Sequence, residues 1–170
     1  MVVISDSNMA SPITGAYRYP QKVHHMIRIM TPDDYDAVHA CWMACTGMGL
    51  NTIDDSREGI ARYLERNPNT CFVSEHDGTI TGAILAGHDG RRGYIYHTAV
   101  NPAYRHQGIG TALVNAALHA LANEGIVKVA LVVFSRNDAG NAFWERLGFT
   151  ARGDLTYRNK ALCAITRIDT

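Results

Sequence analysis

Cysteine is scarce in this sequence of 170 residues, and none of its four cysteines forms a C-x-x-C pair. The chain is too long for a small secreted scaffold held by disulfides, so we expect free thiols. Cys41 and Cys45 stand four residues apart on one helical face, and His39 is the only histidine near them. No two histidines stand four residues apart. These spacings predict buried thiols and no metal site.

A long apolar run is also absent. No stretch of about 20 consecutive apolar residues occurs, so no membrane-spanning helix is expected. The N-terminus lacks the basic-then-apolar pattern of a secretory signal. Sixteen basic and sixteen acidic side chains cancel, which argues against a broad surface for nucleic acid or anionic membranes. We therefore expect a cytoplasmic protein without a nucleic-acid or membrane partner.

Helix and strand signals begin only after residue 23. Residues 1–23 show no hydrophobic period and are interrupted by Pro12, Gly15 and Pro20. We interpret them as an irregular N-terminal arm, and a homodimer contact is one way in which such an arm would be held. Residues 24–170 are predicted to form a single domain with a substantial core, because 46% of the chain is hydrophobic.

The first third of the domain predicts a strand over 26–30 and two helices. Thr31 suits the N-cap of the first helix, with Pro32 at its first position. Apolar residues of 35–45 then fall on one face. The acids and serine at 54–56 predict the start of the second helix, after a loop over 46–53.

Three strands are predicted next, over 71–75, 79–86 and 94–100. Asp77-Gly78 between the first two is a strong signal for a tight hairpin turn. Both connections are short, so the strands are expected to form an antiparallel meander.

The pattern then changes to strand–helix–strand. Residues 108–123 have helical spacing, and the run 127–134 is apolar over its last six residues. Such strands are usually buried on both faces and lie parallel to the preceding strand. Asn137 can cap a further helix, which ends before Gly148. Closing strands are predicted over 149–150 and 155–165, which gives a mixed α/β domain.

A glycine-bearing loop joins the strand 94–100 to the helix 108–123. Its residues Arg105 to Gly110 read Arg-His-Gln-Gly-Ile-Gly. Glycine lets a ligand approach the backbone, and the N–H groups of a helix start form an anion site. A P-loop would need G-x-x-x-x-G-K-[ST], which is absent, and a Rossmann fingerprint fails because Leu113 holds the position of its last glycine.

Two ordered stretches resemble the GNAT (Gcn5-related) N-acetyltransferase family, particularly small bacterial members of uncertain substrate. The first, 98–110, reads TAVNPAYRHQGIG, and the second, 137–149, reads NDAGNAFWERLGF. The resemblance covers about 26–165. It implies a mixed antiparallel–parallel central sheet of about six to seven strands, flanked by helices, in which two central strands splay apart to admit acetyl-CoA.

The resemblance also implies which residues bind the cofactor. Backbone N–H groups of the loop and the helix start would bind the CoA pyrophosphate, and the end of the preceding strand would bind the pantetheine arm and the thioester. The implied cofactor-binding residues are Thr98, Ala99, Val100, Arg105, His106, Gln107, Gly108, Ile109, Gly110, Thr111, Asn137, Asn141, Phe143 and Trp144. For Asn137, a plain helix cap is the alternative interpretation.

The chain departs from the family where catalysis would need an acid. The family often places a tyrosine where this chain has Trp144, and an indole N–H cannot act as an acid. The phenols of Tyr94, Tyr96 and Tyr157 are the alternative candidates. His97 is the candidate base, because imidazole exchanges protons near neutrality, and Val100 N–H is the candidate oxyanion donor. A histidine merely packed beneath a helix is the alternative for His97.

The resemblance implies acetyl transfer from acetyl-CoA to a primary amine, by direct attack in a ternary complex and without a metal. The acceptor would enter near the first two helices, where Trp42, Met48, Leu50 and Asn51 are candidate lining residues or simply core. The alternative function is a CoA-binding regulatory domain with weak or no catalysis, for which Trp144 is the only support.

Overall fold

The computed structural model describes residues 25–169, and the predicted arm, 1–23, lies outside this range. A central sheet of five strands runs through the described domain in the order β1-β3-β4-β5-β6. The first four strands are antiparallel neighbours, and β6 lies parallel to β5. Their bounds are Met26–Ile29, Phe72–His76, Thr79–His88, Gly93–Val100 and Val129–Leu131 for β1, β3, β4, β5 and β6.

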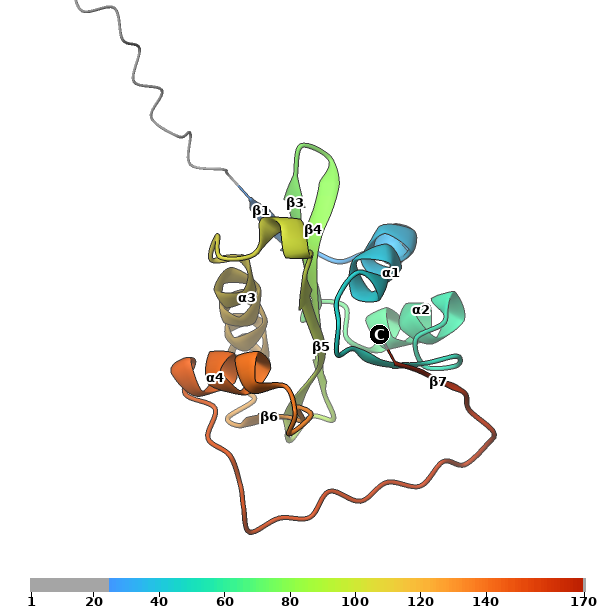
Figure 1. Cartoon of the computed structure of the whole chain (residues 1–170), viewed down its shortest axis with the longest axis vertical. Coiled ribbons are helices and arrows are strands. Elements are labelled where there is room, and N and C mark those ends of the chain that lie inside the picture. The colour runs from blue at the N-terminus through green and yellow to red at the C-terminus, as the bar shows by residue number, and fades with distance from the viewer. Residues whose placement is uncertain (1–24, 170) are drawn as a thin grey trace, which may run out of the picture.

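Helices cover both faces of this sheet (Figure 1). One face carries α1 (Tyr35–Met43), which follows the short 3-10 helix η1 (Pro32–Asp34), and α2 (Arg57–Arg66). The other face carries α3 (Ile109–Asn123) and α4 (Asp138–Arg146). Each side has its own buried cluster, with Trp42 of α1 in the first and Leu113 of α3 in the second. The predicted α/β class and helix positions are confirmed.

The predicted hairpin turn and the predicted start of the second helix are both found in the structure. Asp77 and Gly78 both have positive φ, at 47° and 74°, which is the conformation of a two-residue hairpin turn. Ser56 caps α2 by accepting a hydrogen bond from the Gly59 N–H at 3.0 Å. The meander of β3, β4 and β5 and the parallel pairing of β5 with β6 are confirmed.

The end of the chain differs from the prediction. The expected strand over 127–134 is only three residues long, and Val127 and Val132 are 92% and 54% exposed, so it is not buried on both faces. The expected strands over 149–150 and 155–165 are absent from the described chain, which instead makes a long exposed excursion (Figure 1). Apolar residues in this stretch fit a strand pattern, but a strand forms only where a partner edge pairs with it.

The seven strands therefore form two sheets instead of one. The last strand, β7 (Arg167–Asp169), pairs antiparallel with β2 (Gly49–Asn51) in the loop between α1 and α2. The central sheet of the described chain thus has five strands instead of the predicted six to seven, and β2 lies in a stretch that was predicted to be a loop.

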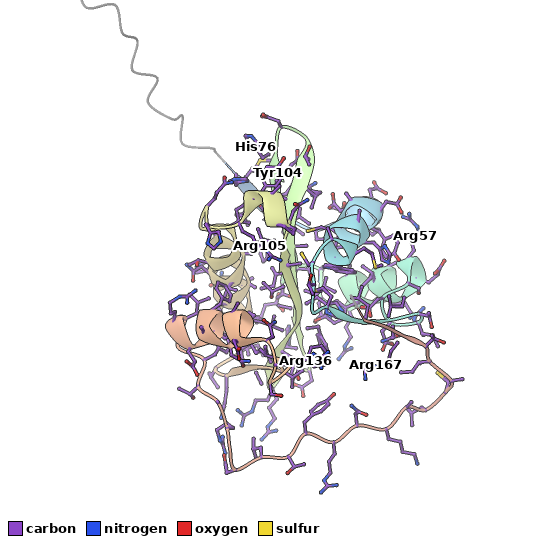
Figure 2. The ribbon with its side chains drawn as sticks, viewed as in Figure 1. Arg57, His76, Tyr104, Arg105, Arg136 and Arg167 are labelled. Atoms are coloured by element: carbon purple, nitrogen blue, oxygen red, sulfur yellow. The ribbon has the colours of Figure 1, made fainter. Side chains whose placement is uncertain are left out.

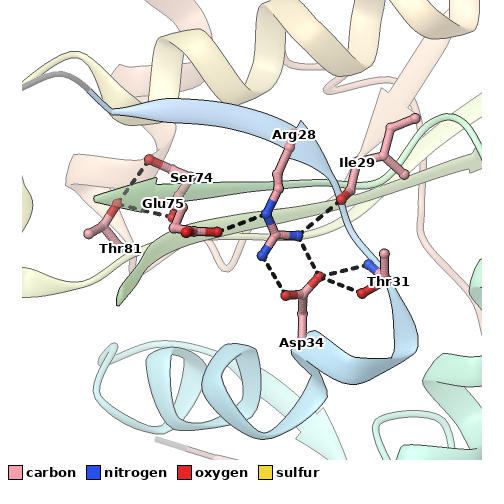
Figure 3. A network of polar contacts seen from close by, with 7 residues as sticks. All are labelled: Arg28, Ile29, Thr31, Asp34, Ser74, Glu75 and Thr81. Atoms are coloured by element: carbon pink, nitrogen blue, oxygen red, sulfur yellow. Dashed lines mark hydrogen bonds and ion pairs between the residues drawn. The ribbon is translucent and has the colours of Figure 1, made fainter. Parts of the chain in front are cut away.

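A network of charged groups fixes the start of α1 to the sheet (Figure 3). The Arg28 guanidinium on β1 donates to both carboxylate oxygens of Asp34 at 2.7 and 2.8 Å and to Glu75 on β3 at 2.8 Å. Asp34 also accepts from the Thr31 N–H at 2.8 Å. The Arg28 guanidinium lowers the pKa of the buried Asp34 carboxyl. The pair therefore orients the helix that carries Trp42.

We expect Asp34→Asn to lower the free energy of unfolding by about 2–3 kcal/mol, because it leaves the Arg28 charge half-buried without its main partner. Because the folded-state pKa of Asp34 lies below its ordinary value of 3.8, the wild-type advantage is fully present above about pH 4–5. It disappears as the pH falls through the folded-state value. Urea unfolding at several pH values measures both effects.

Asp36→Asn is the matched control, since Asp36 pairs with Arg57 at the surface, where its side chain is 80% exposed. Its cost should stay within about 0.5 kcal/mol. Equal losses for the two variants would show that the Arg28–Asp34 pair does not stabilise the fold.

Candidate active site

The two central parallel strands separate after a short paired stretch. Pairing between β5 and β6 runs from Gly93–Val129 to Ile95–Leu131 and then stops. Just beyond this point Tyr96 forms a β-bulge. Leu85 of β4 pairs with His97 and Ala86 pairs with Ile95, so Tyr96 has no partner on β4. From Tyr96 to Val100, β5 therefore has a strand partner on its β4 side and none on the other side within the described chain. This open edge is the predicted splay.

The backbone of Val100 faces this open edge. The N–H of Asn101 donates to the Thr81 carbonyl of β4 at 2.9 Å. Because successive residues of a strand direct their N–H groups to opposite edges, the Val100 N–H points away from β4 and the Ala99 N–H toward it. The Val100 carbonyl accepts from Cys45 Sγ at 3.4 Å and from Arg105 Nε at 3.3 Å, both outside β4.

The loop after β5 brings a helix start to the same edge. A short 3-10 helix, Pro102–Tyr104, leads into exposed residues 105–108, in which His106 and Gly108 have φ of 62° and 80°. The first internal bond of α3 runs from the Ala112 N–H to the Gly108 carbonyl at 3.0 Å. The N–H groups of Ile109, Gly110 and Thr111 therefore have no partner inside the helix. They form an anion-binding site of the expected kind.

Arginine side chains stand at both ends of this region. Figure 2 shows Tyr104 and Arg105 beside one end of β5 and Arg136 on the loop between β6 and α4. The Arg136 guanidinium lies 4.3 Å from the centre of the Phe134 ring. Together with the start of α3, these side chains favour an anionic ligand along the open edge.

An aromatic cluster of α4 packs beside the start of α3. A Cβ added at Gly110 would lie 3.3 Å from the Phe143 ring, so glycine permits this contact. The ring centres of Phe143 and Trp144 are 5.1 Å apart, and Trp144 lies equally close to Phe149. Trp144 is therefore a packing residue in this cluster, and its ring adds no proton donor of acidic character.

The two predicted asparagines hold the turn between β6 and α4. The side-chain carbonyl of Asn137 accepts from the Gly140 N–H at 2.9 Å, so Asn137 is a helix cap. The Asn141 amide donates to the carbonyls of Phe134 at 3.1 Å and Asn137 at 2.9 Å. Their contacts with a cofactor stay predictions.

The loop after α1 lies across from this turn. A Cβ at Gly49 would be 3.0 Å from the Phe134 ring, and one at Gly47 would be 3.9 Å from the Asn137 amide. Trp42, Met48 and Leu50 are buried in the core under this loop, so the core alternative holds for these three residues. Asn51 binds Asp54 and the local backbone through its side chain. A contact of Asn51 with an acceptor stays a prediction.

His97 lies on the α1 and α2 side of β5 and has a buried acidic partner. Its Nε2 is 2.7 Å from Oδ1 of Asp55, and the two side chains are 14% and 6% exposed. The His97 ring also lies 5.2 Å from the Trp42 ring, in an edge-to-face arrangement. This contact of Asp55 was not predicted from the sequence. An acidic residue just before a helix is already explained by its favourable interaction with the helix dipole, so it does not indicate a histidine partner.

The bulge changes the expected face of Tyr96. Regular alternation placed Tyr96 with Thr98 and Val100, but its ring lies 5.6 Å from that of Tyr63 on α2 and 4.7 Å from that of Tyr94. Burial raises the pKa of the Tyr94 phenol, so this group stays protonated at neutral pH. Tyr96 and Tyr157 are 57% and 67% exposed. Tyr94 lies in the part of β5 that is paired with β6, Tyr96 lies at the bulge, and Tyr157 lies close enough to Tyr94 to raise the pKa of its phenol further.

Cys41 and Cys45 are buried thiols outside any disulfide, as predicted, Cys71 is buried as well, and Cys163 is exposed. A hydrogen bond from Cys41, followed by the nearby Arg105, lowers the pKa of the Cys45 thiol. Between residues 25 and 169, three or more histidine, cysteine or acidic side chains do not gather into a metal-binding group.

The open edge fits the CoA arm on two counts. The Thr98 hydroxyl is buried and has no hydrogen-bond partner among the described residues, which leaves a polar group for a ligand at this strand. The N–H groups at the start of α3 are likewise left without helical partners, and this suits a pyrophosphate.

Comparison with known proteins identifies the family. The Acetyltransferase (GNAT) family pattern matches residues 34–149. An acetyltransferase from Pectobacterium atrosepticum is 35% identical over 123 residues, covering 72% of this chain and 86% of that protein. Ard1 from Thermoplasma volcanium has the same fold, with a TM-score of 0.68 at 22% identity, over 76% of this chain and 84% of Ard1.

A second similar structure is the PaiA N-acetyltransferase from Thermoplasma acidophilum, solved with coenzyme A. Its TM-score is 0.66 at 18% identity, and the match covers 76% of this chain and 91% of that protein. The chain belongs to the GNAT acetyltransferase family, and it is an acetyl-CoA-dependent acyltransferase that acts on an amine acceptor. Among the described residues, no helix is long and apolar enough to cross a membrane.

Proposed function

We propose that this chain transfers the acetyl group of acetyl-CoA to a primary amine by direct attack in a ternary complex, without a metal. The observation that carries the proposal is the position of the Val100 N–H. It points to the open edge of β5, between the start of α3 and the face that carries His97. One strand end thus brings together a phosphate site, an oxyanion donor and a base.

The donor would be held along the open edge. N–H groups of residues 105–111 bind its pyrophosphate, while Thr98 and Val100 contact the arm that leads to the thioester. Phe143 and Trp144 form an apolar wall for the thiol end. When bound, acetyl-CoA supplies an acyl thioester, and an ordinary thiol pKa of ~8.5 makes its thiolate a fair leaving group.

The acceptor must lose a proton before it can attack, since an alkyl ammonium has a pKa of ~10.4 and no free lone pair. His97 takes this proton through its imidazole and passes it to solvent. The Val100 N–H donates to the oxygen on which negative charge develops, which lowers the barrier to attack.

Protonation of the leaving thiolate does not depend on Trp144 in this proposal. Tyr94 keeps its phenol proton because burial raises its pKa, and Tyr96 and Tyr157 lie near it. One of these phenols, or water, serves as the acid. A general acid contributes about 10²- to 10⁴-fold, so the reaction proceeds without one at a lower rate.

Binding and turnover distinguish this enzyme from a CoA-binding regulatory domain. Calorimetric titration with acetyl-CoA should show one site per chain, and CoA thiol release across a panel of primary amines should depend on the acceptor. Binding without acceptor-dependent release would favour the regulatory alternative. The absence of binding at millimolar acetyl-CoA would contradict both.

The cytoplasmic location and a homodimer contact stay predictions.

A further inference from the structure

We propose that Asp55 is a positioning residue that keeps the proton of neutral His97 on Nε2 and so leaves Nδ1 as the nitrogen that accepts the proton. The inference rests on the proposed function, in which His97 is the base. It adds a residue 42 positions away in the sequence, on the loop before α2, to the machinery of the site.

Both carboxylate oxygens of Asp55 are held in place. One oxygen is 2.7 Å from His97 Nε2, and the other accepts from the Asn51 N–H at 2.7 Å. The main-chain carbonyl of Asp55 accepts from the Tyr35 hydroxyl of α1 at 2.9 Å. The Asp55 side chain is only 6% exposed. Its contacts with β2 and α1 therefore hold it in place independently of the imidazole.

The loop that carries Asp55 is itself tightly packed. The Asn51 side-chain carbonyl accepts from the N–H groups of Ile53 and Asp54 at 2.9 and 2.7 Å. A Cβ added at Gly59, in the first turn of α2, would lie 2.3 and 2.4 Å from the carbonyl oxygens of the same two residues. The loop therefore packs directly against α2, and this packing restricts the position of the Asp55 carboxylate.

The ring of His97 is also packed against Trp42. Trp42 is fully buried, and its ring meets that of His97 at 62°. An ionised carboxylate can only accept hydrogen bonds. The Nε2 of a neutral His97 must therefore carry the hydrogen, and its Nδ1 keeps the lone pair.

Charge adds to this positioning effect. When His97 takes up the proton, the resulting cation lies beside the Asp55 carboxylate in a largely buried setting, which stabilises it. Tyr35, whose hydroxyl donates to the main chain of Asp55, also lies near the charged side chains of Arg57, Asp36 and Glu58, and His39 packs against Trp42. The hydrogen bond to the imidazole comes from the Asp55 carboxylate.

Asp55→Asn tests the proposal with little change in shape. The asparagine can still accept from the Asn51 N–H, but its amide would donate to Nε2 and move the proton of His97 to Nδ1. We expect kcat to fall about 10²- to 10³-fold, with the KM for acetyl-CoA changed less than about twofold.

Asp54→Asn is the matched control, because this neighbouring carboxylate is exposed and binds the Asn51 side chain at 2.9 Å. Its kcat should stay at the wild-type value. Nitrogen NMR of the imidazole gives a readout that does not need activity: the hydrogen of neutral His97 should be on Nε2 in the wild type and on Nδ1 in Asp55→Asn.

The outcomes separate the two proposals. A hydrogen on Nδ1 in the wild type, or an unchanged tautomer and kcat in Asp55→Asn, would overturn the role of Asp55 even if the enzyme transfers acetyl groups. If the tautomer responds as expected but no amine is acetylated by the wild type, the positioning geometry stands and the proposed function fails.

Discussion

Replacing His97 with glutamine should lower kcat for amine acetylation by about 10²- to 10⁴-fold, the usual contribution of a general base. Glutamine retains an amide that can donate to Asp55, so the buried carboxylate keeps a partner at 2.7 Å or a little more. It cannot take a proton near neutral pH. Steady-state kinetics with an identified amine, together with calorimetric binding of acetyl-CoA, measure the effect.

His119→Gln is the control for this substitution, because His119 is exposed on α3 and contacts only its own helix in the hydrogen bond to Asn123 at 3.3 Å. It should leave kcat and the affinity for acetyl-CoA unchanged. Equal kcat values for His97→Gln and the wild type would exclude His97 as the base. A parallel loss of acetyl-CoA binding would instead indicate a damaged fold.

The second large effect is expected at the start of α3. Gly108→Ala should raise the Kd for acetyl-CoA about 10- to 100-fold, equivalent to one charge-assisted hydrogen bond to the pyrophosphate. Gly108 has φ of 80°, and a Cβ there meets no protein atom within 4 Å. The added methyl group would point into open space at the loop that we propose binds the pyrophosphate, where it would hinder the approach of the ligand to the backbone.

Gly125→Ala is a closely matched control at the other end of the same helix. Gly125 has φ of 81°, and a Cβ there also meets no protein atom within 4 Å. Both substitutions force alanine into the left-handed region at a cost of about 1–2 kcal/mol of stability. Only Gly108→Ala should weaken binding. Equal Kd values for the two variants would argue against a pyrophosphate site at this loop.

Local signals in the sequence predicted most of the fold. The cap at Ser56, the Asp77-Gly78 turn and the glycine at 108 each depend on the conformation of a few consecutive residues. Such preferences are strong enough to survive in the folded chain. The parallel pairing of β5 and β6 followed from the right-handed strand–helix–strand unit, which geometry favours regardless of side chains.

The C-terminal segment shows where this reasoning ends. Leu155, Tyr157 and Leu162 have the spacing and residue types of strands, yet they are exposed in an irregular stretch. Strand formation depends on a free partner edge, and the sequence does not say which edges are available. The pairing of β7 with β2 joins segments over 100 residues apart in the chain, a contact with no local signature.

The candidate site was predictable where it consists of backbone and unpredictable where side chains meet from distant elements. The sequence motif over 98–110 predicted the loop 105–110 and the role of the strand end at Val100. The bulge at Tyr96 did not, because alternation assumes a regular strand, and it turned one predicted catalytic residue toward Tyr63. The contact of His97 with Asp55 needs β5 and the α2 loop to be packed together first.

The most direct test of the account is to follow a labelled acetyl group from acetyl-CoA after mixing with the wild-type protein and a panel of primary amines. We predict an N-acetyl product that forms in equal amount with CoA thiol, only when acceptor is present, and far more slowly with His97→Gln. Bound acetyl-CoA that yields no N-acetyl product with any class of amine, or an acetyl group that accumulates on the protein without acceptor, would contradict direct transfer.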